Sequence, residues 1–287
     1  MRTVVVTAAL LIAACAPVTG NDATTTAAPT TTTTTVAGEG APCLSGDLAF
    51  TDEGPIAAVG GDSGNATVLA GVRWEAHEGC ERVVLDFFSE GGSPASTLGP
   101  AGAIALAESG VLRITLPPEV TASAVADTLF DGTLAKQIFV ARDADNGLFV
   151  DVHLVTDVLV EARAFTVPSP IRLVVDLTPG TGAPLVVAPP TIGDGTVLLA
   201  PAPGAALYPL RVTGYARPEI DAVRVRIYQD DEVALDRSAS TIGPLDSWHS
   251  FDVRLADGPS GPAELFTGPV DAFDEPVDGV TVSLELP

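Results

Sequence analysis

The sequence predicts an all-β protein in which two β-sandwich-like domains follow a leader segment and a disordered, threonine-rich linker. Three observations support this fold class. From Ala66 onward, apolar and polar residues alternate with a period of two, which is typical of half-buried strands. Glycine, proline, asparagine and aspartate interrupt the alternation at short intervals, as turns between strands do. Aromatic residues make up only 5% of the chain, so we expect small aliphatic cores.

The N-terminal segment, residues 1–14, is predicted to be a lipoprotein signal peptide. Its apolar run is too short to span a bilayer as a stable helix. The run ends in Ile12-Ala13-Ala14-Cys15, the pattern of a bacterial lipobox, in which Cys15 becomes the lipidated first residue. Ordinary cleavage near Ala14 or Ala16 is the alternative. Two or three lipid chains on Cys15 would anchor the exported protein durably to the outer face of the cell membrane.

The next segment, residues 15–42, is predicted to be a lipid-anchored flexible linker. Between Asp22 and Val36 the sequence consists almost entirely of threonine, alanine and proline, so nothing there can bury a core.

The chain has three cysteines, and setting Cys15 aside leaves Cys43 and Cys80. An even number of cysteines in an oxidising compartment predicts a disulfide bond. A catalytic or metal-binding thiol is the alternative.

Residues 43–180 are predicted to form the first β domain. Val68, Ala70, Val72, Trp74 and Ala76 are expected to share one face of its first strand, and Glu78-Gly79 is expected to turn the chain into the second. Asn146-Gly147 predicts a tight hairpin turn, because both residue types tolerate positive φ. The segment Val120–Leu129 is the one expected short helix. The further strands expected are Arg82–Phe88, Val111–Leu116, Gln137–Arg142, Leu148–Thr156, Glu161–Val167 and Ile171–Leu177.

A second linker, rich in proline and glycine, is predicted over residues 181–204, with Thr196–Leu199 as a candidate strand inside it. Residues 205–287 then show the short, evenly spaced strands of a β-sandwich. Asp230-Asp231 is expected to form a hairpin turn there. The strands expected are Leu207–Gly214, Val223–Gln229, Glu232–Asp236, Ser250–Leu255, Ala263–Thr267 and Gly279–Leu286.

The formal net charge of −23 argues strongly against nucleic acid as a partner, because the chain has too few cations to neutralise a row of phosphates. It also argues against docking flat on anionic lipid. A neutral glycan, a cationic protein patch or a bound cation remains compatible with this charge. No motif predicts a cofactor.

Two segments of the first domain resemble the AMIN-like domain of envelope proteins and cell-wall amidases. They are Gly79-Cys80-Glu81-Arg82-Val83-Val84-Leu85-Asp86-Phe87 and Pro170-Ile171-Arg172-Leu173-Val174-Val175-Asp176-Leu177. The resemblance covers about Cys43 to Thr178. It implies targeting to the cell envelope, with peptidoglycan as a candidate partner and no catalytic machinery in the domain itself.

The C-terminal domain resembles the immunoglobulin-like module of bacterial spore-germination lipoproteins. The residues concerned are Val212-Thr213-Gly214-Tyr215-Ala216, the strand Val223-Arg224-Val225-Arg226-Ile227-Tyr228, Ser250-Phe251 and the closing Asp278-Gly279-Val280-Thr281-Val282. This likeness implies a fold only, because function does not follow from fold analogy.

Four residues of the first domain are candidates for ligand binding. Arg82, Arg172 and Asp176 would read a glycan or peptide if they faced outward, and Trp74 would stack on a sugar ring. The alternatives are ion pairs across the sheet for the charged residues and core packing for Trp74.

An acidic loop before the last strand is a candidate calcium site, because calcium needs several oxygen ligands close together. Its residues are Asp271, Asp274, Glu275 and Asp278. Solvated loop carboxylates are the alternative.

Two arrangements imitate hydrolase sites. Gly61-Asp62-Ser63-Gly64 looks like a serine-protease nucleophile segment, but no histidine precedes Ser63 in the order that those enzymes use. Cys80, His153 and His249 would supply a Cys-His pair if Cys80 were free.

These observations predict a non-catalytic envelope lipoprotein that binds or scaffolds, with peptidoglycan as a candidate ligand. The first alternative is a protein-interaction adaptor of a surface complex of germination or secretion type, which would bind another envelope protein. The distant alternative is an undescribed envelope hydrolase.

Overall fold

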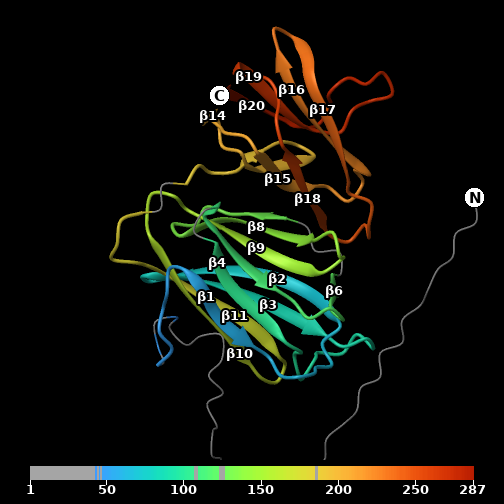
Figure 1. Ribbon diagram of the computed structural model, residues 1–287. Helices are drawn as coiled ribbons and strands as arrows, with labels where there is room; N and C mark the ends of the chain where they lie inside the picture. The colour runs from blue at the N-terminus through green and yellow to red at the C-terminus, as the bar shows by residue number, and fades with distance from the viewer. Residues whose placement is uncertain (1–42, 44, 46, 107–108, 123–126, 185–186) are drawn as a thin grey trace, which may run out of the picture. The chain divides into compact units, whose positions relative to one another are not determined.

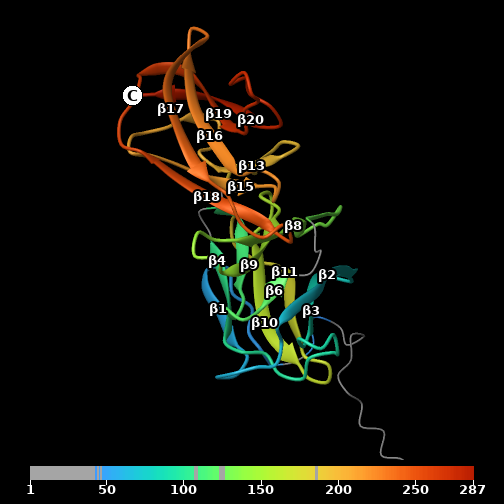
Figure 2. The same ribbon diagram turned by 90° about the vertical axis from the view of Figure 1, so that its right-hand side faces the viewer.

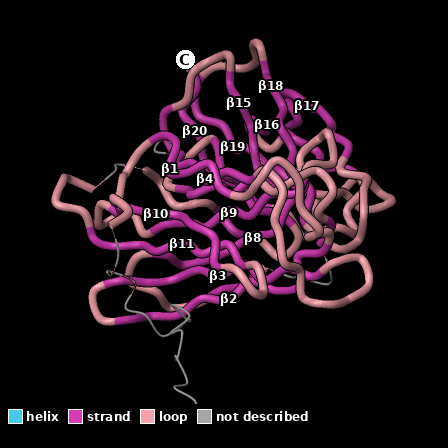
Figure 3. Tube along the Cα trace, turned by 90° about the horizontal axis from the view of Figure 1, so that it is seen from below, coloured by secondary structure: helices cyan, strands magenta, loops and turns pink. Residues whose placement is uncertain are grey.

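All regular structure in the described part of the chain is β-strand, which confirms the predicted all-β class. The computed structural model describes residues 43, 45, 47–106, 109–122, 127–184 and 187–287. Figure 3, coloured by secondary structure, shows strands and loops there and no helix. The described part contains no helix long and apolar enough to cross a membrane. The predicted signal peptide, Cys15 and the 15–42 linker lie outside the described residues.

The strands are β1 (Gly54–Val59), β2 (Val68–His77), β3 (Cys80–Phe88), β4 (Ala101–Leu106), β5 (Val111–Thr115), β6 (Thr121–Ala122), β7 (Thr128–Leu129), β8 (Ala135–Arg142), β9 (Leu148–Leu154), β10 (Val160–Val167), β11 (Arg172–Pro179), β12 (Thr191–Ile192), β13 (Thr196–Ala200), β14 (Gly204–Ala205), β15 (Leu210–Ala216), β16 (Ala222–Gln229), β17 (Glu232–Ser240), β18 (Trp248–Leu255), β19 (Gly261–Gly268) and β20 (Val280–Leu286).

A first sandwich is built from strands β1 to β11. One layer has the order β10-β11-β3-β2-β6, and the other contains β1-β4-β5-β9-β8. Figure 1 shows β3 and β11 side by side in one layer, with β8 and β9 in the other. Alternate residues of facing strands fill the space between the layers, as in other sandwiches. Examples of these core side chains are Val83, Leu85, Phe87, Ile138, Val140, Leu173 and Val175.

A β-bulge corrects the expected face of the first sandwich's long strand, β2. The register shifts between Leu69 and Gly71. Leu69, rather than its expected neighbours Val68 and Ala70, is therefore buried in the core that Val72 and Trp74 also contact. A bulge inserts one extra residue and so reverses the alternation along a strand.

A second sandwich follows along the chain. Strands β18, β15, β13 and β12 form one layer, and β14-β20-β19-β16-β17 form the other. In Figure 2, β16, β17 and β19 lie next to one another. The last strand, β20, alternates strictly between buried and exposed residues. Its buried residues Val282 and Leu284 pack in the second core with Val212, Val225 and Leu265.

One ten-stranded sheet runs through both sandwiches. Its two halves meet where β8 and β18 pair in parallel, with Ala141 opposite Trp248 and Arg142 opposite His249. The segment 181–204, for which we expected a linker, contributes β12 and β13 to this sheet. The candidate strand Thr196–Leu199 is present as β13, which pairs with β15.

Two hairpin turns form where the sequence predicts them. Asp230 and Asp231 both have positive φ, 52° and 66°, and join β16 to β17. Gly79, with a φ of 77°, turns β2 into β3. The loop at Asn146 is longer than expected: Arg142 pairs with Leu148, so five residues connect β8 and β9. The carboxylate of Asp143 organises this loop by accepting hydrogen bonds from the amides of Asp145 and Gly147.

Candidate functional site

The expected binding residues Arg82 and Asp176 form a buried ion pair instead of a solvent-facing surface. Arg82 lies on β3 opposite Asp176 on β11. Its Nε and Nη2 donate to the two carboxylate oxygens at 2.6 and 3.0 Å. Asp176 is completely buried, and Arg82 is 6% exposed. Arg163 on β10 also donates hydrogen bonds to Oδ2 of Asp176. This pair therefore stabilises the sheet and offers nothing to a ligand.

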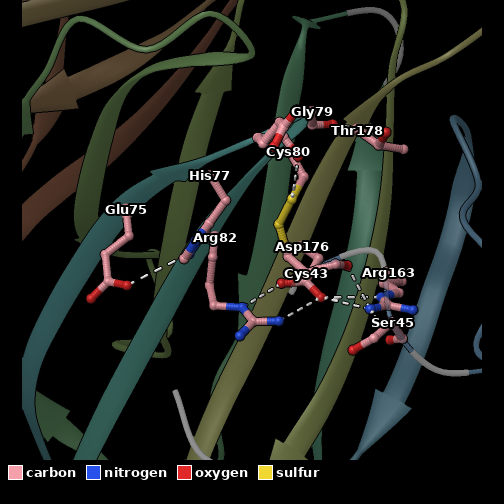
Figure 4. The surroundings of a disulfide bond; sticks show 11 residues. Cys43, Ser45, Glu75, His77, Gly79, Cys80, Arg82, Arg163, Asp176 and Thr178 are labelled. Carbon is pink, nitrogen blue, oxygen red and sulfur yellow. Dashed lines mark hydrogen bonds and ion pairs between the residues drawn. A yellow bond between two sulfur atoms is a disulfide. The ribbon is translucent and has the colours of Figure 1, made fainter. Parts of the chain in front are cut away.

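The predicted disulfide between Cys43 and Cys80 is present, with Cα atoms 6.3 Å apart (Figure 4). It joins the start of the described chain to the start of β3. Arg163 holds the same segment, because its Nη2 donates to the carbonyl oxygens of Cys43 and Ser45 at 2.6 and 2.7 Å. The Cys-His hydrolase alternative is wrong in this structure, since Cys80 has no free thiol.

The other two expected binding residues also have partners within the protein. Trp74 stacks on Phe130, with ring centroids 4.6 Å apart, and donates from Nε1 to Glu81. Arg172 places its Nε 3.6 Å from a carboxylate oxygen of Asp86. Trp74 is therefore packed within the protein, and Arg172 is paired across the sheet. These are the two alternatives that the sequence left open.

Glu81 is a structural residue that the sequence analysis missed. It is 2% exposed, yet its carboxylate accepts hydrogen bonds from the amides of Thr133, Leu134 and Ala135 and from Trp74. Burial raises the pKa of Glu81, but these hydrogen bonds outweigh burial and leave the pKa below its ordinary value. The only signal in the sequence was a charged pair, Glu81-Arg82, directly before the apolar run Val83-Val84-Leu85.

The four carboxylates of the acidic loop, the candidate calcium site, do not come together in the described structure. Asp271 caps its own turn by accepting from the amides of Phe273 and Glu275. Asp274 faces two arginines of β16, with ion pairs to Arg224 at 3.6 Å and Arg226 at 2.5 Å. Glu275 and Asp278 are exposed loop residues. No group of three or more metal-ligating side chains comes together among the residues that the structure describes.

Ser63, His153 and His249, the other residues of the two hydrolase-like arrangements, lie in different parts of the fold. Ser63 lies in an exposed loop before β2. His249 contacts the carbonyl oxygen of Pro244 through Nε2, and His153 is buried on β9. His77 has Glu75 as its neighbour, 3.6 Å away.

A buried polar network joins the two sandwiches. Asp151 on β9 is completely buried and receives two hydrogen bonds from Arg113 on β5, at 2.8 and 2.7 Å. The hydroxyl of Tyr215, on β15 of the second sandwich, donates to the same carboxylate. Burial raises the pKa of Tyr215 well above its usual range, and the neighbouring Asp151 raises it further. For Arg113, burial lowers the pKa, but Asp151 outweighs burial and raises it.

A third apolar cluster surrounds this network. It consists of Phe139, Ala141, Phe149, Val197, Tyr215 and Trp248, which come from both sandwiches. His153 packs edge-on against Phe139, with ring centroids 5.1 Å apart. Neither ring nitrogen of His153 has a hydrogen-bond partner among the described residues, and burial lowers its pKa to about 4. His153 is therefore a neutral core residue at physiological pH.

A cleft of about 610 Å³ opens beside this network, and its lining comes from both sandwiches. Part of its wall is apolar, and part carries hydroxyl, guanidinium and carboxylate groups. Arg113 lines it with a side chain that is 33% exposed. The lining also includes Leu106, Leu199, Arg211, Thr213, Ser250 and Asp252. Such a cleft, with a few converging polar groups, is the arrangement typical of small-molecule sites.

No model of a known protein family matches the chain, and no curated protein matches its sequence. The resemblances to the AMIN-like domain and to the germination-type immunoglobulin-like module stay predictions.

Proposed function

We propose that the protein is an exported, non-catalytic binding or scaffolding module, held by a lipid on Cys15 at the outer face of a bacterial cell membrane. The observation that carries this proposal is the disulfide between Cys43 and Cys80. Disulfides persist in oxidising compartments outside the cytosol. The pairing also leaves Cys15 as the single remaining cysteine, at the end of the lipobox pattern.

The non-catalytic part of the proposal has support from the residues from which a hydrolase would be built. Cys80 is oxidised, His153 is buried with a lowered pKa, and Ser63 lies in an exposed loop. Because the Arg82–Asp176 pair is buried, binding falls to other surfaces of the protein, and the cleft beside Arg113 is one such surface. Peptidoglycan stays the first candidate ligand because of the AMIN-like resemblance.

An adaptor role is the second candidate function, and an exposed sheet edge favours it. Strand β17 ends the order of its sheet and pairs with β16 alone within the described sheet. Most of its residues are exposed. An unpaired edge of this kind can accept a strand from another protein.

The anchoring proposal is tested with a Cys15→Ser variant of the full chain. Wild-type protein is expected in the membrane fraction, with incorporation of labelled fatty acid, and the variant is expected to lose both. Wild-type protein found in the cytosol, with Cys43 and Cys80 both reduced, would contradict the proposal.

The binding role is tested by sedimenting the full-length Cys15→Ser protein with insoluble wall material. Co-sedimentation at low and moderate salt supports peptidoglycan binding. Absence of co-sedimentation, together with one specific protein captured by crosslinking in intact cells, supports the adaptor role instead.

A further inference from the structure

The cleft beside Arg113 carries an unusual share of positive charge for this chain. The protein has 37 acidic residues and 14 lysines and arginines. Arg113 and Arg211 both line the cleft, whose only lining carboxylate is Asp252. An adjoining shallow hollow shares Arg211 and Asp252 and adds Arg254 to the same surface. Three arginines therefore gather where the composition predicts an acidic surface.

Two of these arginines already have a carboxylate partner. The carboxylate of Asp151, which does not line the cleft, accepts hydrogen bonds from Nε and Nη2 of Arg113. Arg211 pairs with Asp252 through Nε and Nη2, at 3.0 and 2.6 Å. Arg254 is exposed, and its guanidinium has no hydrogen bond or ion pair with any of the described residues. One positive charge is therefore left over in the hollow that adjoins the cleft.

The position of Arg254 is also unfavourable within the fold itself. It stands directly opposite Arg211 in the antiparallel pairing of β15 with β18. Like charges directly opposite each other destabilise a sheet. Asp252, which lines the same hollow, neutralises Arg211 and leaves Arg254 without a carboxylate of its own in the described fold, so the arrangement points to an anion that is not part of the chain.

We propose that this cleft binds a small organic ligand with one carboxylate group. Arg254 and Arg211 hold the carboxylate, because the planar guanidinium matches its two oxygens. The hydroxyls of Thr213 and Ser250 lie on the same two strands and hydrogen-bond the polar remainder of the ligand. The side chains of Leu106 and Leu199 contact its aliphatic part. A single excess cation matches a monoanion better than a phosphate dianion.

This inference rests on the proposed binding role, but not on the lipid anchor or on peptidoglycan as the ligand. The test uses the full-length Cys15→Ser protein and calorimetric titration with N-acetylalanine. N-acetylalaninamide, which has the same shape without the charge, is the ligand control. We expect saturable binding of the carboxylate at one site and none of the amide.

Two matched variants locate the site. Arg254→Gln is expected to weaken carboxylate binding about tenfold, because it removes a charge-assisted hydrogen bond. Arg237→Gln removes the same charge from an exposed position on β17 and should leave binding unchanged, because within the described structure this side chain bonds only the neighbouring carbonyl of Asp236. Asp252→Asn removes the carboxylate that competes for Arg211 and should tighten binding.

Lack of saturable binding by the carboxylate would overturn the inference. So would an equal loss in Arg254→Gln and Arg237→Gln, which would indicate a response to net charge alone. Both results leave membrane anchoring and wall sedimentation untouched, so a failure here is distinct from a failure of the proposed function. Because Arg254 and Arg237 are both exposed, unchanged thermal unfolding checks that each variant is folded.

Discussion

The hydroxyl of Tyr215 in the second sandwich donates a hydrogen bond to the buried carboxylate of Asp151 in the first. Asp151 also receives two hydrogen bonds from Arg113. One carboxylate is thus satisfied by donors from both sandwiches, inside an apolar cluster that contains Phe139 and Trp248. A buried charge without its donors is costly, so this network makes the two sandwiches depend on each other.

Replacing Tyr215 by phenylalanine removes one donor to Asp151 and keeps the ring in its cluster. We expect the free energy of unfolding to fall by about 1 to 3 kcal/mol, the cost of a buried group that loses a hydrogen bond. Urea denaturation measures the change. The matched control is Tyr208→Phe, which removes a half-buried hydroxyl bonded to the carbonyl of Pro259. An equal loss in both variants would show that Asp151 has no special dependence on Tyr215.

Replacing Cys43 and Cys80 together by alanine opens a loop with a sequence separation of 37 residues. The unfolded chain then gains conformational freedom, so we expect a loss of about 3 to 4 kcal/mol in unfolding free energy. Urea denaturation of the double variant against wild type provides the measurement. Cys15→Ser, which lies outside the disulfide, should unfold like the wild type, and a double variant of undiminished stability would contradict the prediction.

Replacing Asp176 by asparagine leaves Arg82 and Arg163 buried without their shared negative charge. Breaking such a buried pair typically costs about 3 to 5 kcal/mol. Asp252→Asn is the matched control, because it breaks an exposed pair with Arg211, whose expected contribution is about 0 to 1 kcal/mol. Thermal or urea unfolding of the two variants should therefore separate them clearly. Similar losses of unfolding free energy in the two variants would show that burial does not set the contribution of the Asp176 ion pair to stability.

The buried His153 should make the protein less stable in mild acid. Its pKa is about 4 in the folded protein against an ordinary value of 6.5. The unfolded chain takes up a proton at the higher pH, so the contribution is complete above pH 6.5 and is lost as the pH falls towards 4. The residues that face its ring are Gln137, Phe139, Asp151, Tyr215 and Arg113.

The difference between the two pKa values corresponds to about 3 kcal/mol over this range. His153→Leu should remove that part of the pH dependence when unfolding free energies are compared at pH 7, 6 and 5. If His153→Leu and wild type have parallel pH profiles, His153 does not titrate on unfolding as expected.

The strands that the sequence predicted well are those with strict alternation. The expected segment Gly279–Leu286 is β20, and Val223–Gln229 is β16, each within one residue. Strands β1 and β4, by contrast, were missed. Their sequences, GPIAAV and AGAIAL, contain mostly small residues, so the contrast between faces is weak. They form strands because neighbouring strands supply hydrogen-bond partners, and local propensity is a poor guide in that case.

The expected helix Val120–Leu129 shows the same limit of local reasoning. Its described ends are the two-residue strands β6 and β7, which pair with β2 and β8 respectively. Residues 123–126 lie outside the described part. An apolar pattern in a short segment does not distinguish helix from strand, so the pairing partners decided its outcome.

The all-β class, most strand positions, the disulfide and two hairpin turns could be predicted from the amino-acid sequence, because alternation, cysteine number and turn residues are local or compositional signals. Which polar side chains are buried could be seen only in the three-dimensional fold. Arg82 and Asp176 are 94 residues apart and Asp151 and Tyr215 are 64 apart, and no local signal pairs residues at such separations. Whether a charge faces solvent or a buried partner depends on how distant strands come together, and that depends on the packing of the whole sheet.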